Sequence, residues 1–183
     1  AISLKTSCVP TLSTLTQGNY QYGMTRVQFG DIDVFSPSNS GAGYIFYTDY
    51  SKRSCLMKDI STELTEGNVY PLTINENSSN ATYFSVYLDA NNDGVFSESE
   101  LLVPKISSPN NGVWEDKAFT VNVAIPLNSV KNTPLRLRII GDNGGASYAA
   151  CDPRSYGEVE DYAVTIKDNP ASVWNGSMWS SEP

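Results

Sequence analysis

Stretches in which apolar and polar residues alternate recur along most of the chain. The predicted strands lie at residues 25–35, 44–50, 68–74, 81–88, 114–125, 133–140 and 158–166. Alternation with a period of two places the apolar side chains on one face of a strand. Clusters of Ser, Asn, Gly and Pro separate these stretches and are typical of turns. Short strands at fairly regular spacing, with no convincing helical pattern, predict an all-β fold: an antiparallel β-sandwich, jelly-roll or immunoglobulin-like.

Glycine and proline refine three of these predictions. Gly30 interrupts the alternation of 25–35 and predicts a bulge or a tight bend in one strand. Pro71 lacks a backbone N–H, so it predicts an edge strand or a gap in the hydrogen-bond ladder. Residues 97–103 leave room for at most one helical turn before Pro104.

The segment Asp89–Glu100 has the residue spacing of an EF-hand calcium loop. Calcium takes six to eight oxygen ligands, and alternate residues of a tight loop direct their oxygens to one centre. Gly94 occupies the sixth position, where the backbone turns sharply. The predicted ligands are Asp89, Asn91, Asp93, the Val95 carbonyl and Glu100, with a water held by Ser97. A strand-like stretch precedes the loop, so a bound Ca²⁺ would brace a β-scaffold. The alternative is a metal-free turn, since Asn, Asp and Gly are common in turns.

Composition excludes several kinds of function. The net charge is −8 and no basic patch stands out, so nucleic acid is not an expected partner. The chain has no histidine, which removes Ser-His-Asp and Cys-His catalysis and His-ligated zinc. Paired carboxylates could still act in glycoside hydrolysis, but the conspicuous acids are assigned below to a calcium loop and to a strand that faces arginines. We therefore expect no enzyme activity in this chain.

The length of 183 residues suits one domain, which we place at residues 1–167. Residues 168–183 contain two tryptophans among turn residues, and we interpret them as a linker or the start of another domain. Packing of this tail on the sandwich is the alternative. No apolar run is long enough to span a membrane, and no signal peptide is visible.

Three cysteines, Cys8, Cys55 and Cys151, are far apart in the sequence. Their spacing argues against a zinc site. One disulfide with one remaining thiol is the simplest interpretation in an exported protein. We favour Cys8–Cys151, which would tie the first part of the chain to the last, and Cys8–Cys55 remains open.

Residues Tyr156–Tyr162 read Tyr-Gly-Glu-Val-Glu-Asp-Tyr, the signature of the GEVED domain family, and the chain resembles that family. Further similar parts are Cys8 with Pro10, Val27–Ile32, Tyr47–Tyr50, Val86–Phe96, Leu135–Arg138 and Cys151. The resemblance implies a non-catalytic β-sandwich module of secreted or cell-surface proteins of Bacteroidetes-type bacteria. Such modules are often appended to metallopeptidases, other hydrolases or adhesins.

The signature also has a physical interpretation of its own. In a strand, Glu158 and Glu160 share one face, and Asp161 lies on the other. Arg136 and Arg138 share a face of the preceding predicted strand. If the two strands pair, the arginines can meet carboxylates across the ladder, and we expect structural ion pairs. In the competing hypothesis, Glu160 or Asp161 is a ligand of a second metal site.

The function that these patterns favour is a calcium-stabilised accessory module of a larger secreted or cell-surface protein, active in adhesion or substrate targeting. A structural spacer and a carbohydrate-binding module of a hydrolase or protease are the alternatives. Exposed aromatic residues would contact a polysaccharide or a protein surface. The candidates are Tyr44, Tyr47, Tyr50, Trp114 and Tyr148.

Overall fold

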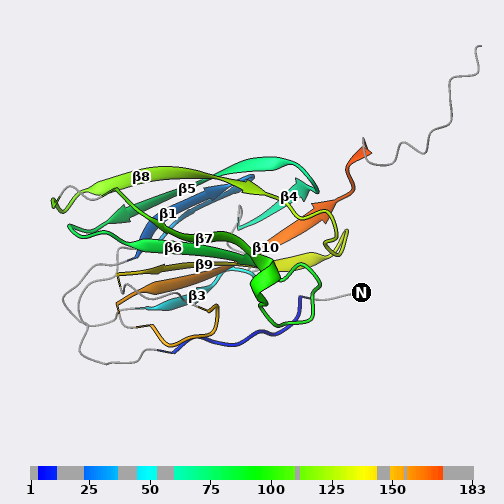
Figure 1. The fold of residues 1–183 in the computed structure, drawn as a ribbon, viewed down its shortest axis with the longest axis horizontal. Coiled ribbons are helices and arrows are strands. Elements are labelled where there is room, and N and C mark those ends of the chain that lie inside the picture. Colours follow the sequence, from blue (N-terminus) through cyan, green and yellow to red (C-terminus); the bar gives the residue numbers. More distant parts are fainter. Residues whose placement is uncertain are drawn as a thin grey trace, which may run out of the picture.

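A computed structural model describes residues 4–11, 23–36, 45–52, 60–109, 112–143, 149–154 and 156–170. These residues form ten strands in two sheets and one 3₁₀ turn, and the two sheets are stacked (Figure 1). The strands are β1 Met24–Phe29, β2 Ile32–Phe35, β3 Tyr47–Asp49, β4 Ser61–Thr65, β5 Val69–Asn77, β6 Tyr83–Leu88, β7 Leu101–Ser107, β8 Asp116–Ala124, β9 Pro134–Asp142 and β10 Glu158–Lys167. The 3₁₀ turn η1 is Glu98–Glu100. The predicted all-β class is confirmed.

The two sheets differ in strand direction. One has the order β2-β1-β5-β8 and is antiparallel throughout. The other has the order β3-β10-β9-β6-β7, with β4 also paired to β10. β3 and β4 both run parallel to β10 and lie one after the other along the same edge of it. The prediction of a wholly antiparallel sandwich is therefore wrong for this sheet, because β3 and β4 reach β10 through long connections rather than tight hairpins.

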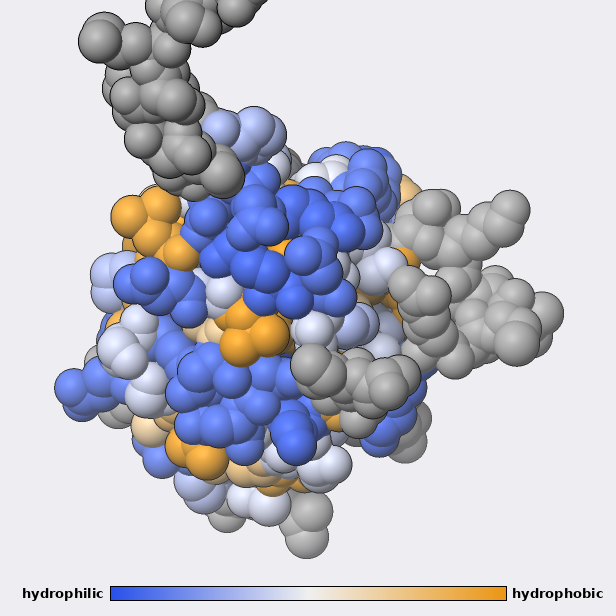
Figure 2. Space-filling view, turned by 90° about the vertical axis from the view of Figure 1, so that its right-hand side faces the viewer, coloured by the Kyte–Doolittle hydropathy of each residue, from blue (hydrophilic) through white to orange (hydrophobic). Residues whose placement is uncertain are grey.

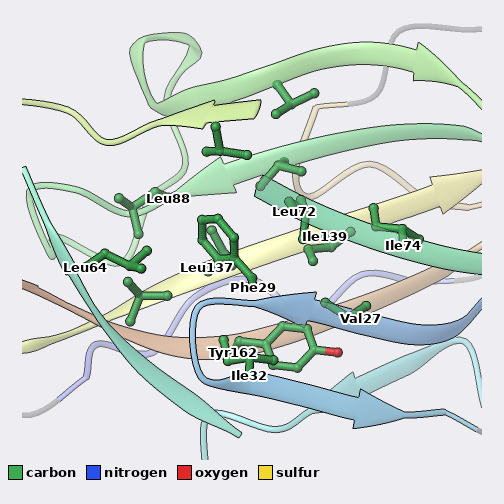
Figure 3. Close-up of a cluster of buried hydrophobic side chains, with 14 of the residues drawn as sticks. Val27, Phe29, Ile32, Leu64, Leu72, Ile74, Leu88, Leu137, Ile139 and Tyr162 are labelled. Atoms are coloured by element: carbon green, nitrogen blue, oxygen red, sulfur yellow. The ribbon is translucent and has the colours of Figure 1, made fainter. Parts of the chain in front are cut away.

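The core lies between the sheets, where apolar side chains of both inner faces meet (Figure 3). Phe29 and Leu72 come from the four-stranded sheet, and Leu137 and Tyr162 come from the other; all four are 1 % exposed or less. Burying side chains of this size is the main favourable contribution to folding, at roughly 1.5–3 kcal/mol each. Tyr162 of the signature is thus a core residue.

Glycine and proline explain three details of the strand ladder. Gly30 has a φ of 59° and turns the chain between β1 and β2, so the predicted single strand is a hairpin of two. Pro71 lies in an interior strand and is paired with β8, but the pairing of β5 with β1 ends at Leu72, which leaves the β1 side unpaired at Pro71. Pro104 lies within β7, a strand that the sequence patterns missed; β7 is the last strand in its sheet, where proline is tolerated.

The N-terminal residues 4–11, which we call the strap, run along the outer face of the six-stranded sheet (blue in Figure 1). A disulfide joins Cys8 to Cys151, with the two Cα atoms 5.8 Å apart, and this pairing was predicted. Beneath it, Tyr87, Ile140 and Val159 form a small second core. Among the described residues, no helix is both long and apolar enough to cross a membrane.

Candidate functional site

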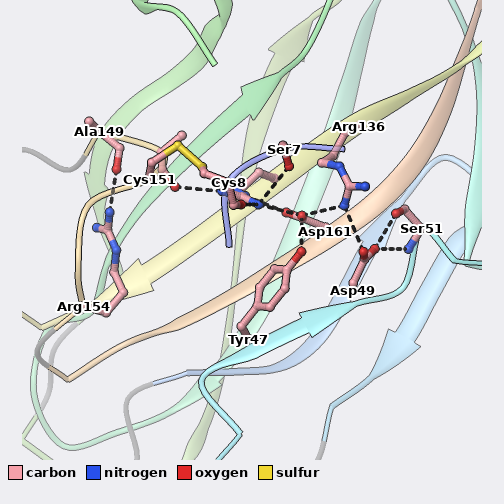
Figure 4. Close-up of polar contacts among 12 residues, drawn as sticks. Ser7, Cys8, Tyr47, Asp49, Ser51, Arg136, Ala149, Cys151, Arg154 and Asp161 are labelled. Atoms are coloured by element: carbon pink, nitrogen blue, oxygen red, sulfur yellow. Dashed lines mark hydrogen bonds and ion pairs between the residues drawn. A yellow bond between two sulfur atoms is a disulfide. The ribbon is translucent and has the colours of Figure 1, made fainter. Parts of the chain in front are cut away.

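Asp161 is the centre of a buried charge cluster on the outer face of the six-stranded sheet (Figure 4). It lies directly opposite Arg138 in the β9–β10 pairing, so both side chains point to the same face. Arg138 approaches it with two nitrogens, Nε at 2.7 Å and Nη2 at 2.8 Å. Arg136 Nη1 and the Tyr47 hydroxyl each donate to Oδ2 at 2.8 Å. Burial, together with the Asp161 charge, raises the pKa of Tyr47, which stays a neutral donor.

The same arginines also hold the strap. Arg138 Nη2 donates to the Cys8 carbonyl and Nη1 to the Ala150 carbonyl, both at 2.9 Å. The Phe96 ring lies 4.7 Å from its guanidinium. Arg154 is fully buried, and its backbone N–H donates to the Thr11 carbonyl at 2.7 Å. The cluster is therefore an attachment between sheet and strap.

The other two acids of the signature lie on the opposite face of β10, inside the sandwich. Glu160 is fully buried and accepts hydrogen bonds from the Ser36 and Tyr162 hydroxyls. Glu158 Oε2 accepts from the Met24 N–H at 3.0 Å. Burial raises the pKa of Glu160 to about 7, and burial with the nearby Glu160 charge raises the pKa of Glu158 well above its usual value.

The predicted ion pairs thus form only at Asp161. For Glu158 and Glu160 the prediction is wrong, because side chains alternate along a strand and the register pairs Asp161, not its neighbours, with an arginine. Neither glutamate forms an ion pair with a basic side chain of the described residues. Sequence reasoning also missed Asp49, which lies 3.2 Å from Arg136 Nη1.

The loop Asp89–Glu100 is tightly organised around two buried carboxylates. Asp89 accepts from the N–H groups of Asp93 and Gly94, both at 3.0 Å. Glu100, 5 % exposed, accepts from the N–H groups of Ala90 and Ser97 at 2.9 Å. The Ser97 hydroxyl also donates to Glu100 at 2.9 Å.

The remaining predicted ligands lie on the exposed side of this loop. Asn91 Nδ2 donates to Asp93 Oδ2 at 2.9 Å, and the Val95 N–H donates to Asp93 Oδ1 at 2.7 Å. The Val95 side chain is 63 % exposed. All five predicted ligands are therefore in one short loop at the surface.

This donor set suits a hard cation such as Ca²⁺, although its carboxylates are turned to backbone N–H groups. Within the described ranges, no three His, Cys, Asp or Glu side chains already enclose a metal position. Burial raises the pKa of Asp89, and the charges of Glu100 and Asp93 raise it further against the N–H bonds that lower it. No described Lys or Arg forms an ion pair with these three acids. Asp89, Asn91, Asp93, Val95 and Glu100 are the residues that would hold the ion.

The aromatic candidates have different environments. Tyr47 belongs to the Asp161 cluster, and Tyr50 stacks on Tyr162 with ring centroids 5.3 Å apart. Trp114 is 49 % exposed in the connection between β7 and β8. Tyr44 and Tyr148, like Cys55, lie outside the described residues.

The family model of the GEVED domain matches residues 83–165, from β6 to β10. Over these residues the chain is similar to the GEVED domain family. No curated protein matches the chain. The GEVED match includes the Asp89–Glu100 loop, both arginines and the signature, whereas β1 to β5 lie outside it.

Proposed function

We propose that this chain is a non-catalytic, calcium-stabilised accessory module of a larger secreted or cell-surface protein, which it serves in adhesion or substrate targeting. The observation that carries the proposal is the difference in bonding partners between Asp161 and the acids of the Asp89–Glu100 loop. Asp161 is buried and satisfied by two arginines, whereas the acids of the Asp89–Glu100 loop have only backbone and side-chain N–H and hydroxyl donors among the described residues.

The buried arginine cluster supports a structural role for the signature. Asp161 accepts from three side chains and has no exposed surface, so no substrate reaches it. Catalytic acids need contact with a reacting group, usually in a cleft. The absence of histidine in the sequence supports the same conclusion.

Calcium in the loop would brace the strap as well as the loop itself. The Lys5 N–H donates to Asn92 Oδ1 at 3.3 Å. Gly94 has a φ of 86°, and a Cβ there would lie 2.5 Å from the Thr6 carbonyl oxygen. The loop therefore forms part of the surface on which the strap lies, so a loop held rigid by Ca²⁺ would also stabilise the position of the strap.

An oxidising compartment is supported by the Cys8–Cys151 disulfide, because such bonds persist mainly in exported proteins. On the face that Figure 2 shows, hydrophobic residues form small separate areas among hydrophilic ones. A surface of this kind suits contact with a polar partner rather than with a large hydrophobic one. The spacer alternative is supported by the same disulfide and ion pairs, which stiffen the module.

The test is thermal unfolding with calcium and with EDTA. A ligand that binds only the folded state stabilises by RT ln(1 + [L]/Kd), about 2.7 kcal/mol at 100 times Kd. We expect Ca²⁺ to raise the melting temperature, and Mg²⁺ to raise it less because it demands a stricter geometry. Asp93→Asn should reduce the calcium shift, and Asp168→Asn, an exposed acid outside the loop, should not. Identical melting curves in calcium and EDTA would overturn the calcium part of the proposal.

A further inference from the structure

A cavity of about 290 Å³ lies between the strap and the end of β3, on the outer face of the six-stranded sheet. Lys5, Thr6 and Ser7 of the strap form one wall. Asp49 and Lys52 form the other, and Arg136 of β9 lies at the same cavity. The disulfide at Cys8 and the arginine bonds hold the strap in place, so the cavity is built by the fold.

The charge of this cavity is opposite to that of the whole chain. Three positive side chains, Lys5, Lys52 and Arg136, line it together with one negative side chain, Asp49, a formal excess of two positive charges. The chain as a whole has a net charge of −8. A local positive field on an acidic protein attracts an anionic group to this position.

Arg136 has hydrogen-bonding capacity left for a ligand. Its Nη1 bonds Asp161 at 2.8 Å and Asp49 at 3.2 Å. Among the described residues, Nη2 makes one long bond, 3.4 Å, to the Lys5 carbonyl, so this nitrogen can donate to a ligand, whereas Nε is buried. The side chain is 6 % exposed, and Nη2 can donate one charge-assisted hydrogen bond to a carboxylate.

We propose that this cavity binds the carboxylate-bearing ring of an acidic sugar, a uronate. The inference rests on the proposed targeting function and names the ligand class. Arg136 and Lys52 would bind the carboxylate, and Thr6, Ser7 and Ser51 have hydroxyls that match the hydroxyls of a sugar. The volume is at the small end for ligand pockets, of which the usual range starts at about 300 Å³, and suits one ring.

The apolar part of the lining agrees with this class. Leu4 and Val9 line the same cavity, and the C–H face of a sugar ring can pack on such side chains. A peptide C-terminus has the same carboxylate but lacks a ring of hydroxyls. The many hydroxyls of the lining favour the sugar.

The test is titration calorimetry of the whole chain, in calcium, with a hyaluronan hexasaccharide, which contains glucuronate. The control ligand is the same oligosaccharide with its carboxylates reduced to alcohols. Lys52→Glu and Lys5→Glu change exposed residues and should each weaken binding about tenfold or more, with binding falling as salt rises. Lys167→Glu is the matched control, since it makes the same charge change at the far end of β10.

Binding of the acidic sugar alone, weakened by Lys52→Glu and kept by Lys167→Glu, supports the proposal. Equal binding of the reduced sugar, a loss in Lys167→Glu equal to that in Lys52→Glu, or no binding would overturn it. Tighter binding of a short peptide with a free C-terminal carboxylate would assign the cavity to a peptide and overturn the sugar class. The calcium melting shift, measured on the same samples, tests the proposed function separately.

Discussion

Two neighbouring residues of β10, Glu160 and Asp161, are both completely buried carboxylates in opposite environments. Asp161 faces outward beneath the strap and meets Arg136 and Arg138. Glu160 faces inward between the sheets, and among the described residues its hydrogen-bond partners are the hydroxyl groups of Ser36 and Tyr162. The comparison teaches that strand register, and not residue type, decides whether an acid is paired as a charge or held with a raised pKa.

The largest effect is expected from Asp161→Asn. The change removes the negative charge between two buried arginines, and breaking one partner of a buried pair costs about 3–5 kcal/mol. Chemical denaturation should show this loss in the free energy of unfolding. Glu63→Gln is the control, because Glu63 is 66 % exposed and its pair with Lys167 is at the surface. A loss equal to that of the control would contradict a buried ion-pair role for Asp161.

The second-largest effect is expected from removal of the Cys8–Cys151 disulfide, which should destabilise the strap on the outer face of the six-stranded sheet. Cys8→Ser with Cys151→Ser removes a link between residues 143 positions apart, and loss of such a link typically costs about 2–4 kcal/mol. The strap should then become more accessible, as faster hydrogen exchange of residues 4–11 would show. Protection of the Glu158–Met24 contact should persist, because it lies on the inner face. Unchanged exchange in the strap would show that the arginine bonds alone hold it.

Glu160→Gln should have the opposite sign to Asp161→Asn. The folded pKa of Glu160, about 7, lies above the ordinary value of 4.5, so the folded state binds its proton more tightly. This group's contribution to stability is full below pH 4.5 and is lost as the pH rises through 7. Glutamine, which stays neutral, should therefore stabilise the protein at pH 8 by about 3 kcal/mol and have little effect at pH 4.

Denaturation of both proteins between pH 4 and pH 8 checks this sign. The free energy of unfolding of the wild type should fall relative to Glu160→Gln over the interval from 4.5 to 7. A variant that is less stable than the wild type at pH 8 would show that the ionised carboxylate is favoured in the fold. The buried acids on both faces of β10 would then be favoured in their ionised form.

The smallest expected effect is that of Glu63→Gln itself. Exposed ion pairs contribute about 0–1 kcal/mol and are screened by salt. The variant should therefore differ from the wild type by less than about 0.5 kcal/mol, and less still in high salt. A larger loss would mean that pairing along the β4–β10 edge depends on this charge.

Residue patterns along the chain predicted most of the strands but not their partners. Alternation found β6, β8, β9 and β10, since it reports which side chains face a core. It missed β4, and it missed β7, which contains a proline and lies at the end of its sheet. It also did not show that β3 and β4 run parallel to β10. Strand neighbours are set by contacts between residues far apart in the chain, which local patterns do not contain.

For the site, the sequence by itself determined the predicted ligand types in the Asp89–Glu100 loop and the Arg-acid composition of the signature, since each depends on spacing or residue type. It favoured the Cys8–Cys151 link but left Cys8–Cys55 open, and the structure decided between them. Only the tertiary structure decided that Asp161 is the acid between the arginines and that Glu160 lies in the core. The reason is that a shift of one residue in register exchanges the two faces of a strand. The cavity with Arg136 likewise exists only because the strap folds back over β9.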